Sequence, residues 1–209
     1  TRAIVQNAAL KSRGVNQQVE AFRRTVRKHT DDPTLHVGVM VDISGSMGSA
    51  MQPMATTAWV MSEAVNRIQG ECAMVYFGND VFPTLKAGQR LKEVSIYSAP
   101  DGTEKFAKAF SALDGALNLL HGNGARLLVV VSDGQYTSEE TRKAEEIVAK
   151  CKEAGVAILW LPFDNGAGAD RLAANYAEVI REITNPAQAA ETIGRAAERV
   201  MTRIGQRVA

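Results

Sequence analysis

The stretch that decides the fold reads Val39-Met40-Val41-Asp42-Ile43-Ser44-Gly45-Ser46-Met47-Gly48. The apolar run that leads into it, Leu35 to Val41, is too short for a helix and rich in valine, which predicts a buried strand. The strand ends in a carboxylate, and two hydroxyls follow at alternate positions. Because ligands bind at the carboxyl edge of open α/β sheets, we expect a binding site here.

The polar triplet offers oxygen ligands only. One carboxylate, Asp42, and two hydroxyls, Ser44 and Ser46, suit a hard cation such as Mg²⁺ better than zinc or copper. A loop that leaves a strand places alternate residues on the same side, so both hydroxyls can point where the carboxylate points. Because Mg²⁺ demands octahedral coordination, further oxygens have to come from outside this loop.

Two later stretches can supply them. Leu127 to Gly134 reads as a second apolar strand that ends in Ser-Asp-Gly, and Ala99 to Thr103 reads as a turn with a hydroxyl at its end, followed by a helical pattern. In this order, the three stretches resemble the von Willebrand factor A (vWA) family over roughly residues 34 to 205. The family's metal-ion-dependent adhesion site (MIDAS) is a DxSxS loop, a Thr in a second loop and an Asp after a later strand. The resemblance implies metal contacts from Asp42, Ser44, Ser46, Thr103 and Asp133.

The resemblance also implies a function. In this family the neutral hydroxyls often touch Mg²⁺ or Mn²⁺ directly, while one or both Asp act through water, so the ion keeps much of its positive charge. It then attracts a Glu or Asp of a partner protein. The expected function is therefore metal-dependent protein binding without catalysis. The alternative implied by the family is a non-catalytic subunit of an AAA+ ATPase or metal-chelatase-type complex.

The order of elements predicts a doubly wound, mostly parallel α/β sheet with helices on both faces, as in vWA and other Rossmann-like folds. We expect helices over about Met51–Gln69, Lys105–Leu120 and Thr137–Ala154, and strands over Cys72–Phe77, Val81–Leu85, 127–132, Val156–Leu161 and about Val179–Ile183. Pro83 indicates that its strand lies at an edge.

Residues 1–33 are expected to form a basic helical extension ahead of a vWA-like domain at 34–209. Apolar residues recur at helical spacing between Val15 and Lys28, among several cations. This helix either packs on the domain with a solvated basic face or docks an acidic partner or nucleic acid. The one aromatic residue of this segment, Phe22, belongs to the apolar pattern rather than to the cations, so base stacking lacks support. A net charge of +1 and the lack of a long apolar stretch argue against nucleic-acid and membrane partners.

Two other interpretations of the Asp42 loop are possible. Asp42 could simply cap the following turn, with both serines bonded to local backbone; Thr103 and Asp133 favour the metal site instead. Ser44-Gly45-Ser46-Met47-Gly48 also resembles the nucleophile elbow of α/β-hydrolases, with Ser46 as nucleophile. The only histidine after it is His121, which we expect at the opposite edge of the sheet, so a serine hydrolase is only a remote alternative.

The two cysteines, Cys72 and Cys151, lie far apart in apolar patterns. They are predicted to be buried free thiols in a reducing cytosol, and a disulfide is the alternative. We therefore expect a cytoplasmic protein.

Overall fold

The computed structural model describes residues 35–67, 69–91, 102, 104–162, 172, 178–179, 195 and 199, without the side chains of 48–54, 57 and 58. The chain divides into two units, Thr1–Asp32 and Pro33–Ala209. The predicted helical extension at 1–33 lies outside the described residues, so the domain division expected there stays a prediction.

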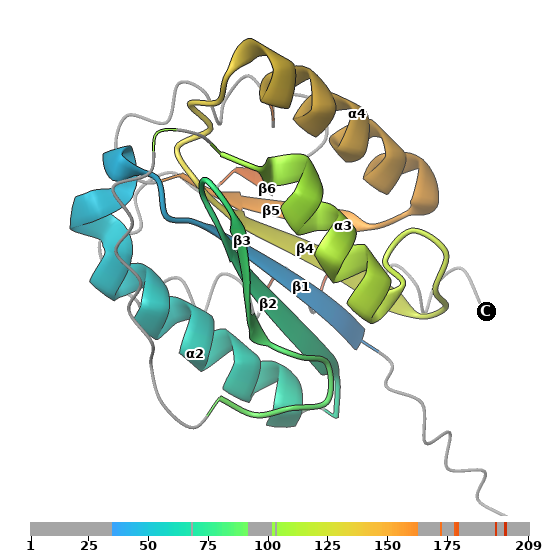
Figure 1. Cartoon of the computed structure of the whole chain (residues 1–209). Helices are drawn as coiled ribbons and strands as arrows, with labels where there is room; N and C mark the ends of the chain where they lie inside the picture. The colour runs from blue at the N-terminus through green and yellow to red at the C-terminus, as the bar shows by residue number, and fades with distance from the viewer. Residues whose placement is uncertain are drawn as a thin grey trace, which may run out of the picture. The chain divides into compact units, whose positions relative to one another are not determined.

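A six-stranded sheet forms the centre of the second unit, in the order β3-β2-β1-β4-β5-β6 (Figure 1). Its strands are β1 (Leu35–Asp42), β2 (Glu71–Phe77), β3 (Val81–Leu85), β4 (Ala125–Val131), β5 (Ala157–Leu161) and β6 (Glu178–Val179). All neighbours pair in parallel except β2 and β3. The predicted doubly wound α/β fold is confirmed, including the edge position of the strand that contains Pro83.

Helices cover both faces of this sheet. A short 3₁₀ helix, η1 (Gly45–Ala50), leads into α2 (Met51–Arg67), and α3 (Phe106–Leu117) and α4 (Ser138–Ala154) lie on the opposite face (Figure 1). Alternate residues of β1 divide between two apolar cores, as the period of a strand requires. Val37 and Val39 pack in the cluster that contains Met61 of α2, whereas Met40 packs in the one that contains Leu113 of α3.

Gly38 lets α3 approach β1 closely. A Cβ at this position would lie 3.1 Å from Cδ1 of Leu119 and 3.2 Å from Cδ1 of Leu113. The missing side chain thus makes room for Leu113 of α3 and for Leu119, just beyond the end of that helix, so that α3 can pack close to the central strand.

The helix ends follow local signals. Thr137 caps α4, since its Oγ1 accepts a hydrogen bond from the backbone N–H of Glu140, and Gly155 ends the helix at φ 76°. The α3 helix ends three residues earlier than predicted. Asn118 adopts a left-handed conformation at φ 50°, and the carboxylate of Asp114 accepts a hydrogen bond from the N–H of Leu120.

Cys72 and Cys151 are free and buried, and they belong to the apolar clusters on opposite faces of the sheet. A disulfide between them is therefore impossible, and the predicted free thiols are confirmed. Burial raises the pKa of each thiol to about 12. Within the described ranges, no helix has the length and apolar character needed to cross a membrane.

Candidate metal centre

The centre lies where the connections of the sheet change direction. From β1 the chain crosses through α2 to β2 on one side, while β4 pairs with β1 on the other. Val41 of β1 lies opposite Val131 of β4, so Asp42 and Ser132 follow at the same edge. Such a switch point is the usual ligand position in open α/β sheets.

Asp42 is fully buried and holds two loops together. Its Oδ1 accepts a 2.8 Å hydrogen bond from the N–H of Ser44, and its Oδ2 accepts a 2.6 Å hydrogen bond from the hydroxyl of Ser132. The first contact is the turn-capping bond of the structural alternative, so Asp42 does have that role. Each carboxylate oxygen can still accept a second contact, so capping does not exclude a metal role.

Ser44 and Ser46 bring their hydroxyls together. The two Oγ atoms lie 3.1 Å apart, with Ser44 buried and Ser46 exposed. An octahedral Mg²⁺ with oxygens at 2.0–2.1 Å holds neighbouring ligands about 2.9 Å from each other. The separation of the hydroxyls thus fits two adjacent positions of such an ion, and Ser46 marks the side open to solvent.

Asp133 lies at the end of the neighbouring strand and is only 4% exposed. Its Oδ1 accepts a hydrogen bond from the N–H of Gln135, and no described residue donates to Oδ2. Thr103 lies outside the described residues. The structure thus brings four of the five expected residues, Asp42, Ser44, Ser46 and Asp133, to one edge of the sheet, and their role as metal ligands stays a prediction.

Ser132 organises this edge, which the sequence analysis did not foresee. Its hydroxyl donates to Asp42 and accepts hydrogen bonds from the N–H of Gly134 at 3.0 Å and the hydroxyl of Tyr136 at 2.8 Å. Its carbonyl accepts a 2.9 Å bond from the indole N–H of Trp160. A hydroxyl next to Asp133 was visible in the sequence, but its direction depends on contacts across strands.

Glu104 adds a third acidic side chain. It is 8% exposed, and burial, followed by the nearby charges of Asp42 and Asp133, raises its pKa to about 7. Burial also raises the pKa of Asp42, against the hydrogen bonds from Ser132 and Ser44. A bound cation would relieve this repulsion. The sequence analysis did not name Glu104. Its position directly after Thr103 is the feature of the sequence that could have identified it.

The donor set favours a hard cation held partly by hydroxyls. Among the described residues, no group of three His, Cys, Asp or Glu side chains could hold a metal ion. A metal at this edge would therefore depend on the hydroxyls of Ser44 and Ser46, which is the chemistry of Mg²⁺ or Mn²⁺ rather than of zinc.

The hydrolase alternative requires a histidine base beside Ser46, and neither described histidine, His36 or His121, lies at that edge of the sheet. His121 follows α3 and precedes the amino end of β4, whereas Ser46 follows the carboxyl end of β1. Eight residues of β1 separate these edges by about 23 Å. His36 lies near the amino end of β1, with its Nδ1 3.4 Å from Oε2 of Glu71.

The family model of VWA domain containing CoxE-like proteins matches residues 6–198. The chain belongs to this family. The match begins within the basic N-terminal segment, so the family pattern is not confined to the vWA-like part predicted at 34–209. No curated protein matches the chain significantly.

Solved structures confirm the vWA fold. Manganese-loaded TRAP protein of Plasmodium vivax aligns with a TM-score of 0.59 and 16% identity over 80% of this chain and 74% of that one. An aerotolerance-related membrane protein of Bacteroides fragilis gives 0.53 and 15% identity over 79% and 99%. Proximal thread matrix protein 1 from the mussel byssus gives 0.56 and 13% identity over 81% and 48%. At these identities the likeness concerns the fold of this CoxE-like vWA domain alone.

Proposed function

We propose that this vWA domain holds Mg²⁺ or Mn²⁺ at the carboxyl ends of β1 and β4, and that the ion binds a Glu or Asp side chain of a partner protein. The observation that carries the proposal is the hydroxyl pair of Ser44 and Ser46, 3.1 Å apart, beside the buried carboxylate of Asp42. The pair has the spacing of adjacent ligands, and the exposure of Ser46 leaves a side from which a partner can approach.

The hydroxyls of Ser44 and Ser46 and the carboxylate of Asp42 would have different roles at the metal. Ser44 and Ser46 offer neutral oxygens, while Asp42 is held in place by Ser132 and by its own turn. When bound, the metal supplies a positive charge that neutral ligands leave largely uncompensated. An acidic partner side chain then completes the coordination. None of these roles moves a proton or breaks a bond, which supports a binding rather than an enzymatic function.

The partner is proposed by class only. The resemblance to intracellular vWA proteins of bacteria suggests an AAA+ ATPase, with this chain as its non-catalytic subunit. The buried free thiols Cys72 and Cys151 suit a reducing compartment, so we propose a cytoplasmic location.

The metal is tested by calorimetric titration of Mn²⁺ into the metal-free chain, chosen because a structural neighbour is manganese-loaded. We expect saturable binding by the wild type. Ser46→Ala should weaken it at least about tenfold, because a direct ligand should matter no less than an outer-shell contact. Ser111→Ala, which changes an exposed serine on α3, is the matched control. No binding by the wild type, or equal affinities in Ser46→Ala and wild type, would contradict the proposal.

A further inference from the structure

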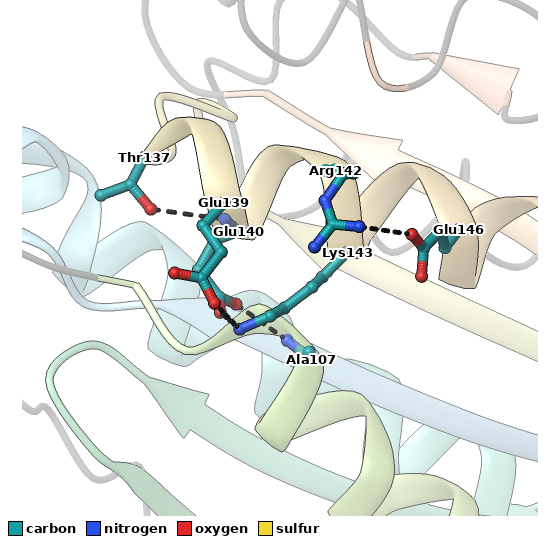
Figure 2. Close-up of polar contacts among 7 residues, drawn as sticks. All are labelled: Ala107, Thr137, Glu139, Glu140, Arg142, Lys143 and Glu146. Atoms are coloured by element: carbon teal, nitrogen blue, oxygen red, sulfur yellow. Dashed lines mark hydrogen bonds and ion pairs between the residues drawn. The ribbon is translucent and has the colours of Figure 1, made fainter.

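A further acidic side chain, that of Glu140, joins the two helices that begin beside the metal centre. Glu140 is the third residue of α4, and the Thr137–Glu140 pattern is that of a capping box, in which the glutamate turns back to the N-cap residue. Here its Oε2 accepts a 3.3 Å hydrogen bond from the backbone N–H of Ala107, in the first turn of α3 (Figure 2). Glu140 therefore caps a helix that begins more than thirty residues before its own position.

The α3 helix gains an acceptor from this contact. Its N-cap residue, Lys105, makes no side-chain cap bond, and Glu140 is the side chain that the described residues offer to the N–H groups of the first turn, which have no partner within the helix. A carboxylate at this place satisfies one of these groups and is also favoured by the helix dipole. Its other oxygen, Oε1, lies 2.9 Å from Nζ of Lys143, which keeps the carboxylate directed between the two helices.

The connection spans the two loops of the metal centre. Ala107 lies three residues after Glu104 and four after Thr103, and Glu140 lies seven residues after Asp133. The α3 start is also tied to the sheet, because the N–H of Lys105 donates to the carbonyl of Gly78 at 3.0 Å. The bond from Glu140 adds the link to the loop that carries Asp133.

We propose that Glu140 is a positioning residue for the metal centre: its carboxylate holds the first turn of α3 and thereby sets Glu104, three residues before Ala107, relative to Asp133. The proposal rests on the metal site put forward above. It gives Glu140 a role that Glu139 lacks, although both carboxylates pair with Lys143. Glu139 is 72% exposed against 16% for Glu140, and no described contact joins it to α3.

The test compares Glu140→Ala, Glu140→Gln and Glu139→Ala in the full chain, with Mn²⁺ affinity and thermal melting measured for each. Glu140→Ala should weaken Mn²⁺ binding about tenfold, the usual effect of losing an outer-shell contact. Glu140→Gln should restore most of the affinity, because its amide oxygen can still accept from Ala107. Glu139→Ala should bind as the wild type does. A lower melting temperature in Glu140→Ala with unchanged Mn²⁺ affinity would reduce Glu140 to a structural role and overturn the proposal, as would a Gln variant as weak as Ala.

A metal-independent readout separates this proposal from the proposed function. Hydrogen exchange of the amides at 104–107, measured in EDTA, should be faster in Glu140→Ala and unchanged in Glu139→Ala. If the wild type binds no Mn²⁺, the proposed function fails, and the exchange rates still decide whether Glu140 holds the start of α3. Equal exchange in all the proteins would overturn that assignment, whatever the metal affinities are.

Discussion

The hydroxyl of Ser132 donates a 2.6 Å hydrogen bond to Oδ2 of Asp42, 90 residues away in sequence, and so ties the carboxyl end of β4 to that of β1. Both side chains are fully buried. The bond fixes the position of one carboxylate oxygen of Asp42. The hydroxyls of Ser44 and Ser46 lie on the loop that follows Asp42.

Ser132→Ala should therefore destabilise the domain. The substitution removes the donor to the buried Asp42 carboxylate and the acceptor for Tyr136, and an unsatisfied buried group costs about 1–3 kcal/mol. We expect a loss of about 3 kcal/mol in the free energy of unfolding, measured by urea denaturation in EDTA. Ser111→Ala on the exposed side of α3 should stay within about 0.5 kcal/mol. Similar small losses in the two variants would show that the link between β1 and β4 adds little.

The stability of the metal-free domain should fall as the pH rises. Burial and the charges of Asp42 and Asp133 raise the pKa of Glu104 from an ordinary value of 4.5 to about 7. The folded state therefore holds the proton more tightly than the unfolded state, and the free energy of unfolding decreases between about pH 4.5 and pH 7.

Glu104→Gln should remove this contribution. Compared with the wild type in EDTA, its melting temperature should be raised more at pH 8 than at pH 5, because only the ionised carboxylate is unfavourable. Glu153→Gln, on the exposed side of α4, controls for the loss of one negative charge. A difference between Glu104→Gln and wild type that is the same at both pH values would refute the assignment.

The domain should fold without metal and gain stability from it. Two apolar clusters on the faces of the sheet form the core, and most of their members lie away from the metal edge, with Ile43 and Met47 as the members from the metal loop. We expect cooperative thermal unfolding in EDTA. Mn²⁺ at a hundred times its dissociation constant should add about 2.7 kcal/mol by mass action. Differential scanning calorimetry with and without Mn²⁺ measures both, and loss of the cooperative transition in EDTA would make the ion structural.

Partner binding should depend on the metal and on its expected ligands. Because a carboxylate–metal contact in a partly desolvated site should be a hot spot, Thr103→Ala and Asp133→Ala should each weaken the complex by at least about 2 kcal/mol, or roughly thirtyfold. The partner is first captured in Mg²⁺ and released by EDTA, then titrated against wild type and both variants. Equal affinities in Mg²⁺ and in EDTA would move the interface away from this edge.

Much of the fold could be predicted because buried parallel strands are almost continuously apolar. The runs before Asp42 and Asp133 marked β1 and β4, and the rule for carboxyl edges placed both carboxylates together. The predicted end of α3 at Leu120 was wrong because Asn118 adopts a left-handed conformation, which an apolar pattern does not reveal.

The connections within the site could not be predicted in the same way. The capping-box pattern of Thr137 and Glu140 accounts for the bond from Glu140 N–H to Thr137, but not for the bond from Ala107 N–H of α3 to the Glu140 carboxylate. The contact between Glu140 and Ala107, like the one between Ser132 and Asp42, depends on which loops lie next to each other at the sheet edge. The spacing of residues along the chain does not show which loops are neighbours.

The edge strand β3 has a consequence for the behaviour of the chain at high concentration. Open sheets tend to aggregate when an unpaired strand offers a straight row of donors and acceptors to another molecule. The β3 strand is five residues long, contains Pro83, which has no N–H, and pairs with β2 through an irregularity at Met74 and Val75. It is therefore a poor template for strand addition, which disfavours polymerisation through this edge during synthesis and storage.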